Sequence, residues 1–431
     1  MQKLPELIQY VEDKQLRGAY IGSLFTSWPE CAVPDPDALI VEGIQCFQQA
    51  NDTSGEARFN VALGYFFGLQ NDIPKATRFL TSGLLGSRHL GDAILQSLAL
   101  RQLAEINNRL GNNRLGQEQA HESHKLAQLS GHFHSAAYSM LAEGSCHISL
   151  GNYPRAQRLF KDARNLLAVC GLQGSMRDLR IANFEAEVAY LQSEYTESRR
   201  IRVSIVEFGD RAPFAHLYAL INLACTDISM GADEHQVRKS LDAARSVCVS
   251  MSYSRGFEAC DIILAQLHLS QGRLTEAHTL FEQSFNLIRE RDVEGSLLCL
   301  EALGDPNNGM GNLDSTFTWT VILLGVGLQG RNMLAIYRAF RCLGDTFSEQ
   351  GDKDTALTLF ETALEGFTAM EIHRGKADCL VRIGDIWKYR GHSETAETFW
   401  KAARPLFQRS SQGKDVAKVD DRLAAGNLEC I

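Results

Sequence analysis

The 431-residue sequence lacks long apolar runs and an excess of positive charge. No stretch approaches the ~18 consecutive apolar residues that a membrane-spanning helix needs. Lys and Arg number 43 against 52 Asp and Glu, a formal net charge of −9. A general nucleic-acid or anionic-membrane surface requires the opposite balance. We therefore expect a soluble, cytoplasmic protein that binds neither nucleic acid nor membrane.

The sequence also lacks the short motifs that mark chemical sites. Its eleven cysteines include no C-x-x-C pair, so most should be small buried residues in a reducing compartment. A phosphate loop needs Gly-Lys followed by Ser or Thr, and neither Gly-Lys pair, at 375–376 or 413–414, has this continuation. There is no G-x-S-x-G or H-E-x-x-H motif. We expect no catalysis and no cofactor.

A period of about 40 residues is present instead. Segments 343–363 and 383–403 align without a gap at an offset of 40, and 143–163, 264–284 and, more weakly, 63–83 follow the same frame. One turn residue marks each repeat: Asn71, Gly111, Gly151, Ser193, Gly231, Gly272, Gly311, Gly351 and Gly391. A period in this range is typical of repeat architectures.

Each repeat is predicted to be a pair of antiparallel helices. Ile336, Phe340, Leu343 and Phe347 precede one turn at helical spacing. Seven residues before every turn stands a small residue that lets two helices cross closely: Gly64, Ala104, Gly144, Ala186, Ala224, Ala265, Gly304, Gly344 and Gly384. Short acceptor side chains that follow the turn are expected to cap the second helix: Asp72, Asn112, Asn152, Asn312 and Asp352.

These residues resemble the tetratricopeptide repeat family. One repeat matches the motif fully, with Leu343, Gly344, Phe347, Ala356, Phe360 and Ala363, and another matches nearly as well, with Ile383, Gly384, Trp387, Ala396, Trp400 and Ala403. The usual repeat has ~34 residues. Repeats of 40 are similar to those of kinesin light chain and of the sensor arrays in signal-transduction (STAND-type) NTPases. The resemblance implies an all-α fold, an α-solenoid of about nine helical hairpins coiled into a right-handed superhelix.

The repeat frame divides the chain into five segments. They are an atypical N-terminal helical cap (1–53), repeats 1–6 (54–291), a degenerate repeat 7 (292–331), repeats 8 and 9 (332–412) and a C-terminal capping helix (413–431). Repeat 7 is weak because Pro306 interrupts it and its second helix is rich in Thr and Val, which are poor helix formers. It is either held in place by its neighbours or forms a hinge.

The resemblance implies that first helices line a concave groove, with the residue after each small crossing position facing into it. That row is Tyr65, Glu105, Ser145, Glu187, Cys225, Gln266, Asp305, Asp345 and Asp385, acidic at five positions and basic at none. With nearby positions, the predicted partner-binding residues are Arg338, Arg341, Asp345, Glu349, Asp378, Asp385, Lys388, Glu105, Arg101 and Arg109. Such a groove suits a peptide carrying basic residues. Alternatively, the charges pair with one another.

The implied function is a protein–protein interaction scaffold or adaptor that binds a peptide or partner protein in this groove. The alternative is a ligand-sensing, regulatory module that works with a signalling NTPase, either as a separate chain or within a longer parent chain. The charged clamp that grips the acidic C-terminal tail of chaperones needs Lys, Asn and Arg across three consecutive repeats. That pattern is absent, so a chaperone tail is not an expected partner.

Histidines cluster at His121, His124, His132 and His134. The first pair shares one helical face, and the second pair would complete a metal site if the connector folded over it. Zinc sites need three or four convergent ligands. Solvated histidines are also common at a helix end and in the loop after it. We therefore predict no metal site here, with a zinc site as the less favoured alternative.

Overall fold

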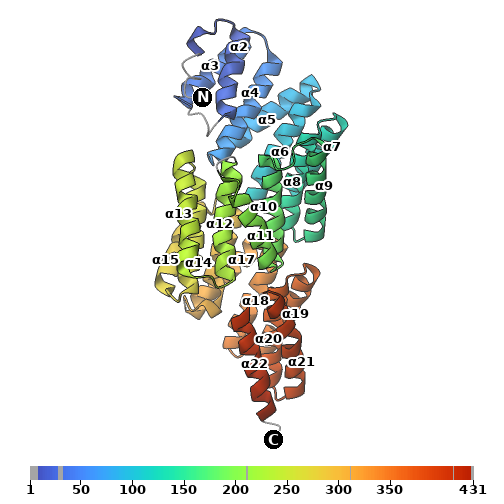
Figure 1. Ribbon diagram of the computed structural model, residues 1–431, viewed down its shortest axis with the longest axis vertical. Coiled ribbons are helices and arrows are strands. Elements are labelled where there is room, and N and C mark those ends of the chain that lie inside the picture. The colour runs from blue at the N-terminus through green and yellow to red at the C-terminus, as the bar shows by residue number, and fades with distance from the viewer. Residues whose placement is uncertain (1–7, 28–32, 210–211, 311, 411, 429–431) are drawn as a thin grey trace. The chain divides into compact units, whose positions relative to one another are not determined.

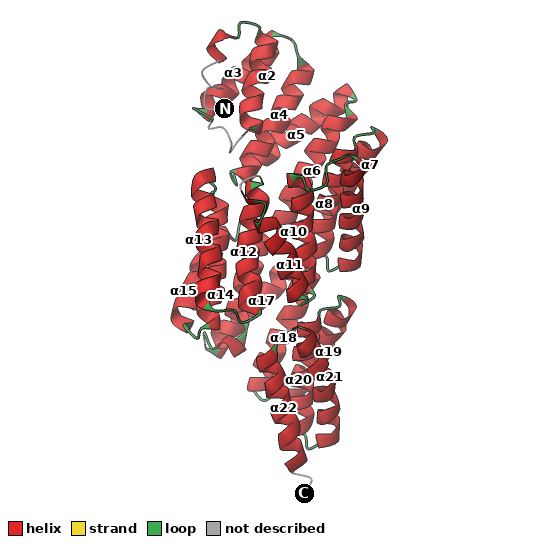
Figure 2. Cartoon of the chain, viewed as in Figure 1, coloured by secondary structure: helices red, strands yellow, loops and turns green. Residues whose placement is uncertain are grey.

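The computed structural model describes residues 8–27, 33–209, 212–310, 312–410 and 412–428, which are helical and contain no strand (Figures 1 and 2). After the short 3-10 turn η1 (Ile8–Tyr10), the helices are α2 (Lys14–Thr26), α3 (Pro36–Gln49), α4 (Thr53–Leu69), α5 (Ile73–Leu90), α6 (Ala93–Arg109), α7 (Asn113–Leu129), α8 (Phe133–Ser149), α9 (Tyr153–Val169), α10 (Met176–Leu191), α11 (Tyr195–Val206), α12 (Pro213–Ser229), α13 (Glu234–Met251), α14 (Ser254–Ser270), α15 (Leu274–Ile288), α16 (Val293–Gly304), α17 (Leu313–Gly330), α18 (Met333–Glu349), α19 (Lys353–Ala369), α20 (His373–Tyr389), α21 (Ser393–Arg409) and α22 (Gly413–Leu428), with η3 (Pro306–Asn308) between α16 and α17. The predicted all-α solenoid class is confirmed.

Left-handed turn residues recur about every 20 residues, twice as often as the sequence period. The eight predicted turn residues that the structure describes all have positive φ: Asn71, Gly111, Gly151, Ser193, Gly231, Gly272, Gly351 and Gly391. The ninth, Gly311, lies outside the described residues. Residues midway between them also have positive φ: Asn51, Gly91, Gly131, Gly171, Ser252, Arg331 and Glu371. Most turns between hairpins therefore resemble those within hairpins, so most repeats consist of two similar halves; the turn between α15 and α16, at 289–292, is an exception with no positive φ.

The residue after most of these turns forms hydrogen bonds with both the preceding and the following helix. The N–H of Asp352 donates to the Phe347 carbonyl (3.0 Å), and that of Ile372 to the Phe367 carbonyl (2.9 Å), which closes the preceding helix. Four of the five predicted caps also accept an N–H of the next helix through their side chains: Asp72, Asn152, Asn312 and Asp352. The prediction was wrong for Asn112, whose side chain donates to Asn107 Oδ1 instead.

The small residue at the helix crossing packs against the residue sixteen positions later. A Cβ placed on the glycine would approach that residue within 3.0 Å in five hairpins: Gly64 with Leu80, Gly144 with Phe160, Gly304 with Thr320, Gly344 with Phe360 and Gly384 with Trp400. Where the crossing residue is Ala104, it clusters with Ala120, also sixteen positions later. The predicted role of the small residue is thus confirmed, and its size is coupled to that of a specific partner.

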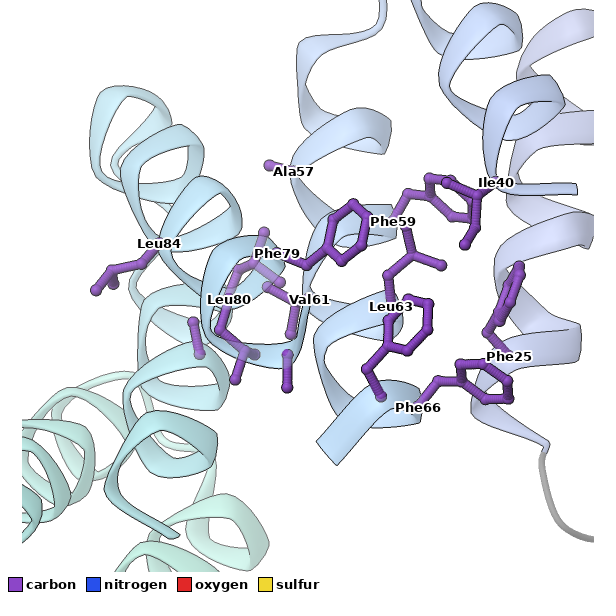
Figure 3. Close-up of a cluster of buried hydrophobic side chains, with 14 of the residues drawn as sticks. Phe25, Ile40, Ala57, Phe59, Val61, Leu63, Phe66, Phe79, Leu80 and Leu84 are labelled. Carbon is purple, nitrogen blue, oxygen red and sulfur yellow. The ribbon is translucent and has the colours of Figure 1, made fainter. Parts of the chain in front are cut away.

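The first of two compact units comprises residues 1–146, 158–178 and 246–255. At its N-terminal end α2 and α3 cover α4, and their aromatic side chains meet in one cluster (Figure 3). The ring of Phe25 contacts those of Phe59 and Phe66 edge-on, with centroids 6.0 and 4.9 Å apart. Burial of each such ring contributes about 1.5–3 kcal/mol. The segment before the first repeat therefore extends the apolar core of this unit.

The second unit, residues 147–157, 179–245 and 256–431, contains the weak repeat 7. Pro306 follows α16, which ends at Gly304 after only 12 residues. Despite its Thr and Val residues, α17 is a continuous helix of 18 residues. The Thr320 hydroxyl lies within hydrogen-bonding distance of two acceptors in the hairpin, the Gly304 and Thr316 carbonyls. Leu323 is buried. Tertiary burial thus outweighs the low helix propensity of this segment.

Within unit 2 the C-terminal hairpins contact turns far earlier in the sequence. The N–H of Arg374 donates to Ser193 Oγ (3.2 Å), and Gln412 Nε2 donates to the Ser229 carbonyl (2.8 Å). Residues separated by 181 and 183 positions thereby become neighbours. At the C-terminal end, α22 buries Val419 in the cluster that also contains Phe407 of α21. Unit 2 therefore closes on itself, and its first helices belong to one compact body.

Seven of the nine described cysteines are buried, as predicted for most of them. Burial raises the pKa of the Cys146, Cys299 and Cys379 thiols to about 12. These thiols are protonated small side chains of the core. In the part of the chain that the structure describes, no helix is both long enough and apolar enough to cross a membrane.

Candidate functional site

Charged residues predicted to line the groove of unit 2 form one strip along α16, α18, α20 and α22. The last three acids of the row each pair with an arginine about one repeat later: Asp305 with Arg341 (2.7 Å), Asp345 with Arg382 (2.5 Å) and Asp385 with Arg422 of α22 (2.8 Å). In each pair the arginine lies 36 or 37 residues after the acid. This separation is one 40-residue repeat shortened by about one helical turn. We name this set, with Glu301, Arg338 and Asp378, the inner strip.

Asp345 lies at the centre of the inner strip and is 8% exposed. Its Oδ1 accepts from Arg382 Nε, its Oδ2 accepts from Asn307 Nδ2 (2.7 Å), and Arg341 Nη1 lies 3.8 Å away. Removing a carboxylate from water costs several kcal/mol unless ion pairs and hydrogen bonds replace the lost hydration. These partners come from three successive repeats, so the Asp345 carboxylate joins all three.

Asp305 occupies the position where Pro306 ends α16. Burial would raise the pKa of its carboxyl group, but the positive charges of Arg341 and Arg382 outweigh this effect, with hydrogen bonds from Asn307 and Arg341 adding to it. The pKa of Asp305 is therefore lowered to about 2. The charged carboxylate is the form that stabilises the fold.

The replacement Asp305→Asn should make this contribution visible through its pH dependence. Because the folded pKa lies below the unfolded value of about 3.9, the stabilisation is fully present above that value and is lost as pH falls towards 2. We expect the wild type to exceed the variant in unfolding free energy by a constant amount above about pH 5. Urea titrations at several pH values should show this difference shrinking between about pH 4 and pH 2. A difference independent of pH would contradict the assignment.

Other charges of the inner strip keep more contact with solvent. Arg338 pairs with Glu301 of the preceding first helix, and their side chains are 24% and 25% exposed. Burial alone would lower the pKa of Arg338, but the negative charge of the Glu301 carboxylate outweighs this effect and the pKa is raised overall. Asp378, 3.9 Å from Arg382, is 26% exposed. By contrast, the side chain of Arg341, which pairs with Asp305, is only 10% exposed.

The remaining predicted residues of unit 2 are Glu349 and Lys388. Glu349 is exposed near the end of α18. Lys388 Nζ donates to Ser393 Oγ (3.3 Å), across the turn between α20 and α21. Asp385 has a second role, since its Oδ1 also accepts from the indole N–H of Trp400 (3.0 Å). These residues lie at the solvent-exposed end of the same first helices.

The predicted groove residues of unit 1 also have partners within their own unit. Arg101 donates to Glu105 one turn later on α6 (2.8 Å), and its guanidinium lies 5.3 Å from the ring centre of Tyr138. Arg109 donates to the Gly68 carbonyl (3.1 Å) and to Asn71 Oδ1. A cation at the C-terminal end of α4 is electrostatically favourable. Arg109 therefore has a structural role in addition to the binding role predicted for it.

The first helices of repeats 4 to 6 are joined by neutral hydrogen bonds, and these repeats also contain ion pairs such as that of Arg199 with Asp227 (2.7 Å). The Tyr190 hydroxyl contacts Ser229 Oγ (3.1 Å) and Cys225 Sγ (3.2 Å), and Cys225 Sγ contacts Gln266 Oε1 (3.4 Å). Burial raises the pKa of Tyr190 well above its usual value, so the phenol is neutral. Within unit 2, neutral groups therefore link repeats 4 to 6, and ion pairs link repeats 7 to 9 and α22.

The sequence prediction missed the basic partners Arg382 and Arg422. A signal for them was present, because each follows an acid of the row by 37 residues. Arg338, Arg341 and Asp345 each form an ion pair with another charged residue of the strip, as the alternative interpretation of the groove charges expects. Contact of the predicted residues with a partner stays a prediction.

The histidine cluster differs from the predicted one. His121 and His124 do share a face of α7, but the third group within ligand distance of both is Glu143 of α8. His132 and His134 lie near each other, with ring centres 5.7 Å apart, and are not members of this group, which was sought among the described residues only.

Residues 263–291, in α14 and α15, match the family model described as tetratricopeptide repeat. The resemblance to the tetratricopeptide repeat family is confirmed. The matched hairpin buries Ala265, Ala277 and Phe281, and none of the three has any exposed surface. These tetratricopeptide positions form the close crossing of the two helices. No curated protein matched the sequence.

Several solved structures are similar to this chain. A Rap protein complexed with Competence and Sporulation Factor has 10% identity and a TM-score of 0.42, with 97% of this chain and 99% of that chain covered. A signal transduction ATPase with numerous domains (STAND) from Pyrococcus horikoshii, with a tetratricopeptide repeat sensor, has 12% identity and a TM-score of 0.38, covering 99% and 64%. Yeast Tom70 has 12% identity and a TM-score of 0.40, covering 98% and 96%.

Proposed function

We propose that this tetratricopeptide repeat protein binds a peptide or an extended segment of a partner protein along the inner strip of unit 2. A fold of this family implies a protein–protein interaction scaffold. The observation that supports the inner strip as a binding surface is that some of its side chains are nearly buried and others are partly exposed. Asp345 and Arg341 are nearly buried and join repeats, whereas Glu301, Arg338 and Asp378 keep about a quarter of their side chains accessible. The accessible charges are the ones that a partner can reach.

The chemistry of the accessible groups favours a partner segment with basic residues. Lys or Arg of the segment would pair with Glu301 and Asp378, and an acidic group would pair with Arg338. Complementary charges of this kind increase the specificity of binding and the association rate. Because these groups are partly solvated, binding should weaken as salt rises above about 0.15 M. We propose no catalytic activity for the strip.

Neutralising the accessible acids tests this proposal. The double replacement Glu301→Gln and Asp378→Asn retains side-chain size and hydrogen-bonding capacity while removing two negative charges. The matched control is Glu361→Gln and Glu365→Gln on α19, where both side chains are exposed. Affinity capture at low salt, quantified by mass spectrometry, should show partners retained by the wild type and the control. The inner-strip variant should lose at least about 80% of them, since one removed pair at about 1–1.5 kcal/mol already weakens binding about tenfold.

Circular dichroism and thermal denaturation would establish that both double variants fold. If the folded inner-strip variant captures the same proteins in the same amounts as the wild type, the proposed binding surface is wrong. Loss of partners by the α19 control would equally contradict it.

A further inference from the structure

We propose that His121, His124 and Glu143 form a zinc site that links α7 to α8 in unit 1. One potential ligand atom from each residue lies within 4.8 Å of the others. The three side chains come from two helices that follow each other directly in the chain. This site is separate from the inner strip, so its test does not depend on the proposed binding function.

The local fold brings these three side chains together. His121 and His124 are three positions apart, so they share one face of α7. Gly131 then takes a left-handed conformation, with φ of 71°, and reverses the chain into α8. Glu143 lies on α8 opposite the two imidazoles, with its Oε1 facing His121 Nδ1 and its Oε2 facing His124 Nδ1. The ring centres of the histidines are 6.4 Å apart.

The distances between the carboxylate and the two imidazoles are compatible with ligands of one metal ion as well as with hydrogen bonds. Glu143 Oε1 lies 3.2 Å from His121 Nδ1, and its Oε2 lies 3.4 Å from His124 Nδ1. A charge-assisted N–H···O bond is shorter, about 2.7–2.9 Å. Tetrahedral zinc lies about 2.0–2.2 Å from nitrogen and oxygen ligands, which places adjacent ligand atoms about 3.3–3.5 Å apart. Each imidazole lies at about this distance from its own carboxylate oxygen, and one ligand atom of each residue lies within 4.8 Å of the others, so modest side-chain rotations would bring all three to one ion.

Burial and charge also favour a cation here. Glu143 has a side chain only 2% exposed, and a buried carboxylate is costly without a compensating positive charge. A divalent cation between the three side chains would add such a positive charge to the contacts that Glu143 already makes. Two imidazoles and one carboxylate are a ligand set that zinc accepts.

The three ligands leave one coordination position for water or another small ligand. His121 is 41% exposed while His124 is 15% exposed, so the fourth position should face the solvent beside His121. The site would connect the second helix of one hairpin to the first helix of the next. Zinc should therefore raise the thermal stability of unit 1.

Isothermal titration of the full-length, chelator-treated protein with ZnCl2 tests the proposal. We expect one site per chain, with binding at least about tenfold weaker in His121→Ala and in Glu143→Gln, because even outer partners of zinc ligands change affinity by this much. The matched control is His278→Ala, since His278 forms a two-residue pair with Glu282 on α15 (3.9 Å). This control should bind zinc as the wild type does.

Cobalt substitution distinguishes this site from the cysteines. Co²⁺ should give the visible absorption of tetrahedral nitrogen and oxygen coordination without a thiolate charge-transfer band. Zinc should raise the thermal unfolding midpoint of the wild type and not that of His121→Ala. Since His121 is partly exposed, this variant should fold even if Glu143→Gln does not. No zinc binding by the wild type, a thiolate band, or unchanged binding by His121→Ala would overturn the proposal.

Discussion

Replacing Asp345 with Ala should lower the free energy of unfolding by about 3–5 kcal/mol, the usual cost of breaking a buried ion pair from one side. The variant leaves Arg382, with a side chain only 18% exposed, without its closest carboxylate. It also removes the acceptor for Asn307 Nδ2. Because the Asp345 carboxylate contacts residues of repeats 7, 8 and 9, its removal should weaken the packing among all three repeats. Urea denaturation followed by circular dichroism measures the effect.

The same replacement at Asp354 is the matched control. Asp354 also pairs with an arginine of the next hairpin, Arg390, 36 residues later. Its side chain, however, is 93% exposed, and exposed ion pairs contribute about 0–1 kcal/mol. We therefore expect Asp354→Ala to cost less than about 1 kcal/mol. Equal destabilisation by the two variants would mean that burial of the inner strip does not determine its energetic role.

Replacing Gly344 with Ala should destabilise the protein by about 1–3 kcal/mol, although alanine is the better helix former. The added Cβ would lie 2.6 Å from the ring of Phe360, which is 1% exposed and has little room to move. Gly325 of α17 offers the matched control, because nothing lies within 4 Å of a Cβ placed there. Gly325→Ala should stabilise the helix by up to about 1 kcal/mol.

The coupling between position 344 and the residue sixteen positions later provides a further check. Shortening the facing side chain by Phe360→Leu should make Gly344→Ala less costly, since the two changes compensate in volume. Thermal and urea unfolding of the single and double variants measure this coupling. If Gly344→Ala costs the same in both backgrounds, the close crossing does not limit the size of residue 344.

The hairpins could be predicted from the sequence because their signals are local. A turn residue such as Gly351, a cap such as Asp352 and a small residue such as Gly344 act within a few positions of themselves. Asn112 shows the limit of this reasoning, because a neighbouring amide at Asn107 competes for its side chain. The 20-residue spacing of turns was not evident, since Arg331 and Glu371 adopt positive φ without being residue types that favour it.

Contacts between repeats could be predicted only in part. The acidic row followed from the family resemblance, but its partners depend on how far one first helix is displaced along the next. That displacement is about one helical turn, so Arg382 meets Asp345 at an offset of 37 residues and not 40. The carboxylate of Glu143 beside His121 and His124 could not be found by spacing for the same reason, since it requires knowing which faces of α7 and α8 meet.

The most direct test of the account is a double-mutant cycle for Asp345 and Arg382, with Asp354 and Arg390 as the reference pair. The central claim is that buried ion pairs, whose two residues lie about 37 positions apart, join successive repeats of unit 2. It predicts a coupling free energy of about 1–3 kcal/mol for Asp345 with Arg382 and below about 0.5 kcal/mol for Asp354 with Arg390. A coupling near zero for Asp345 with Arg382 would contradict the claim.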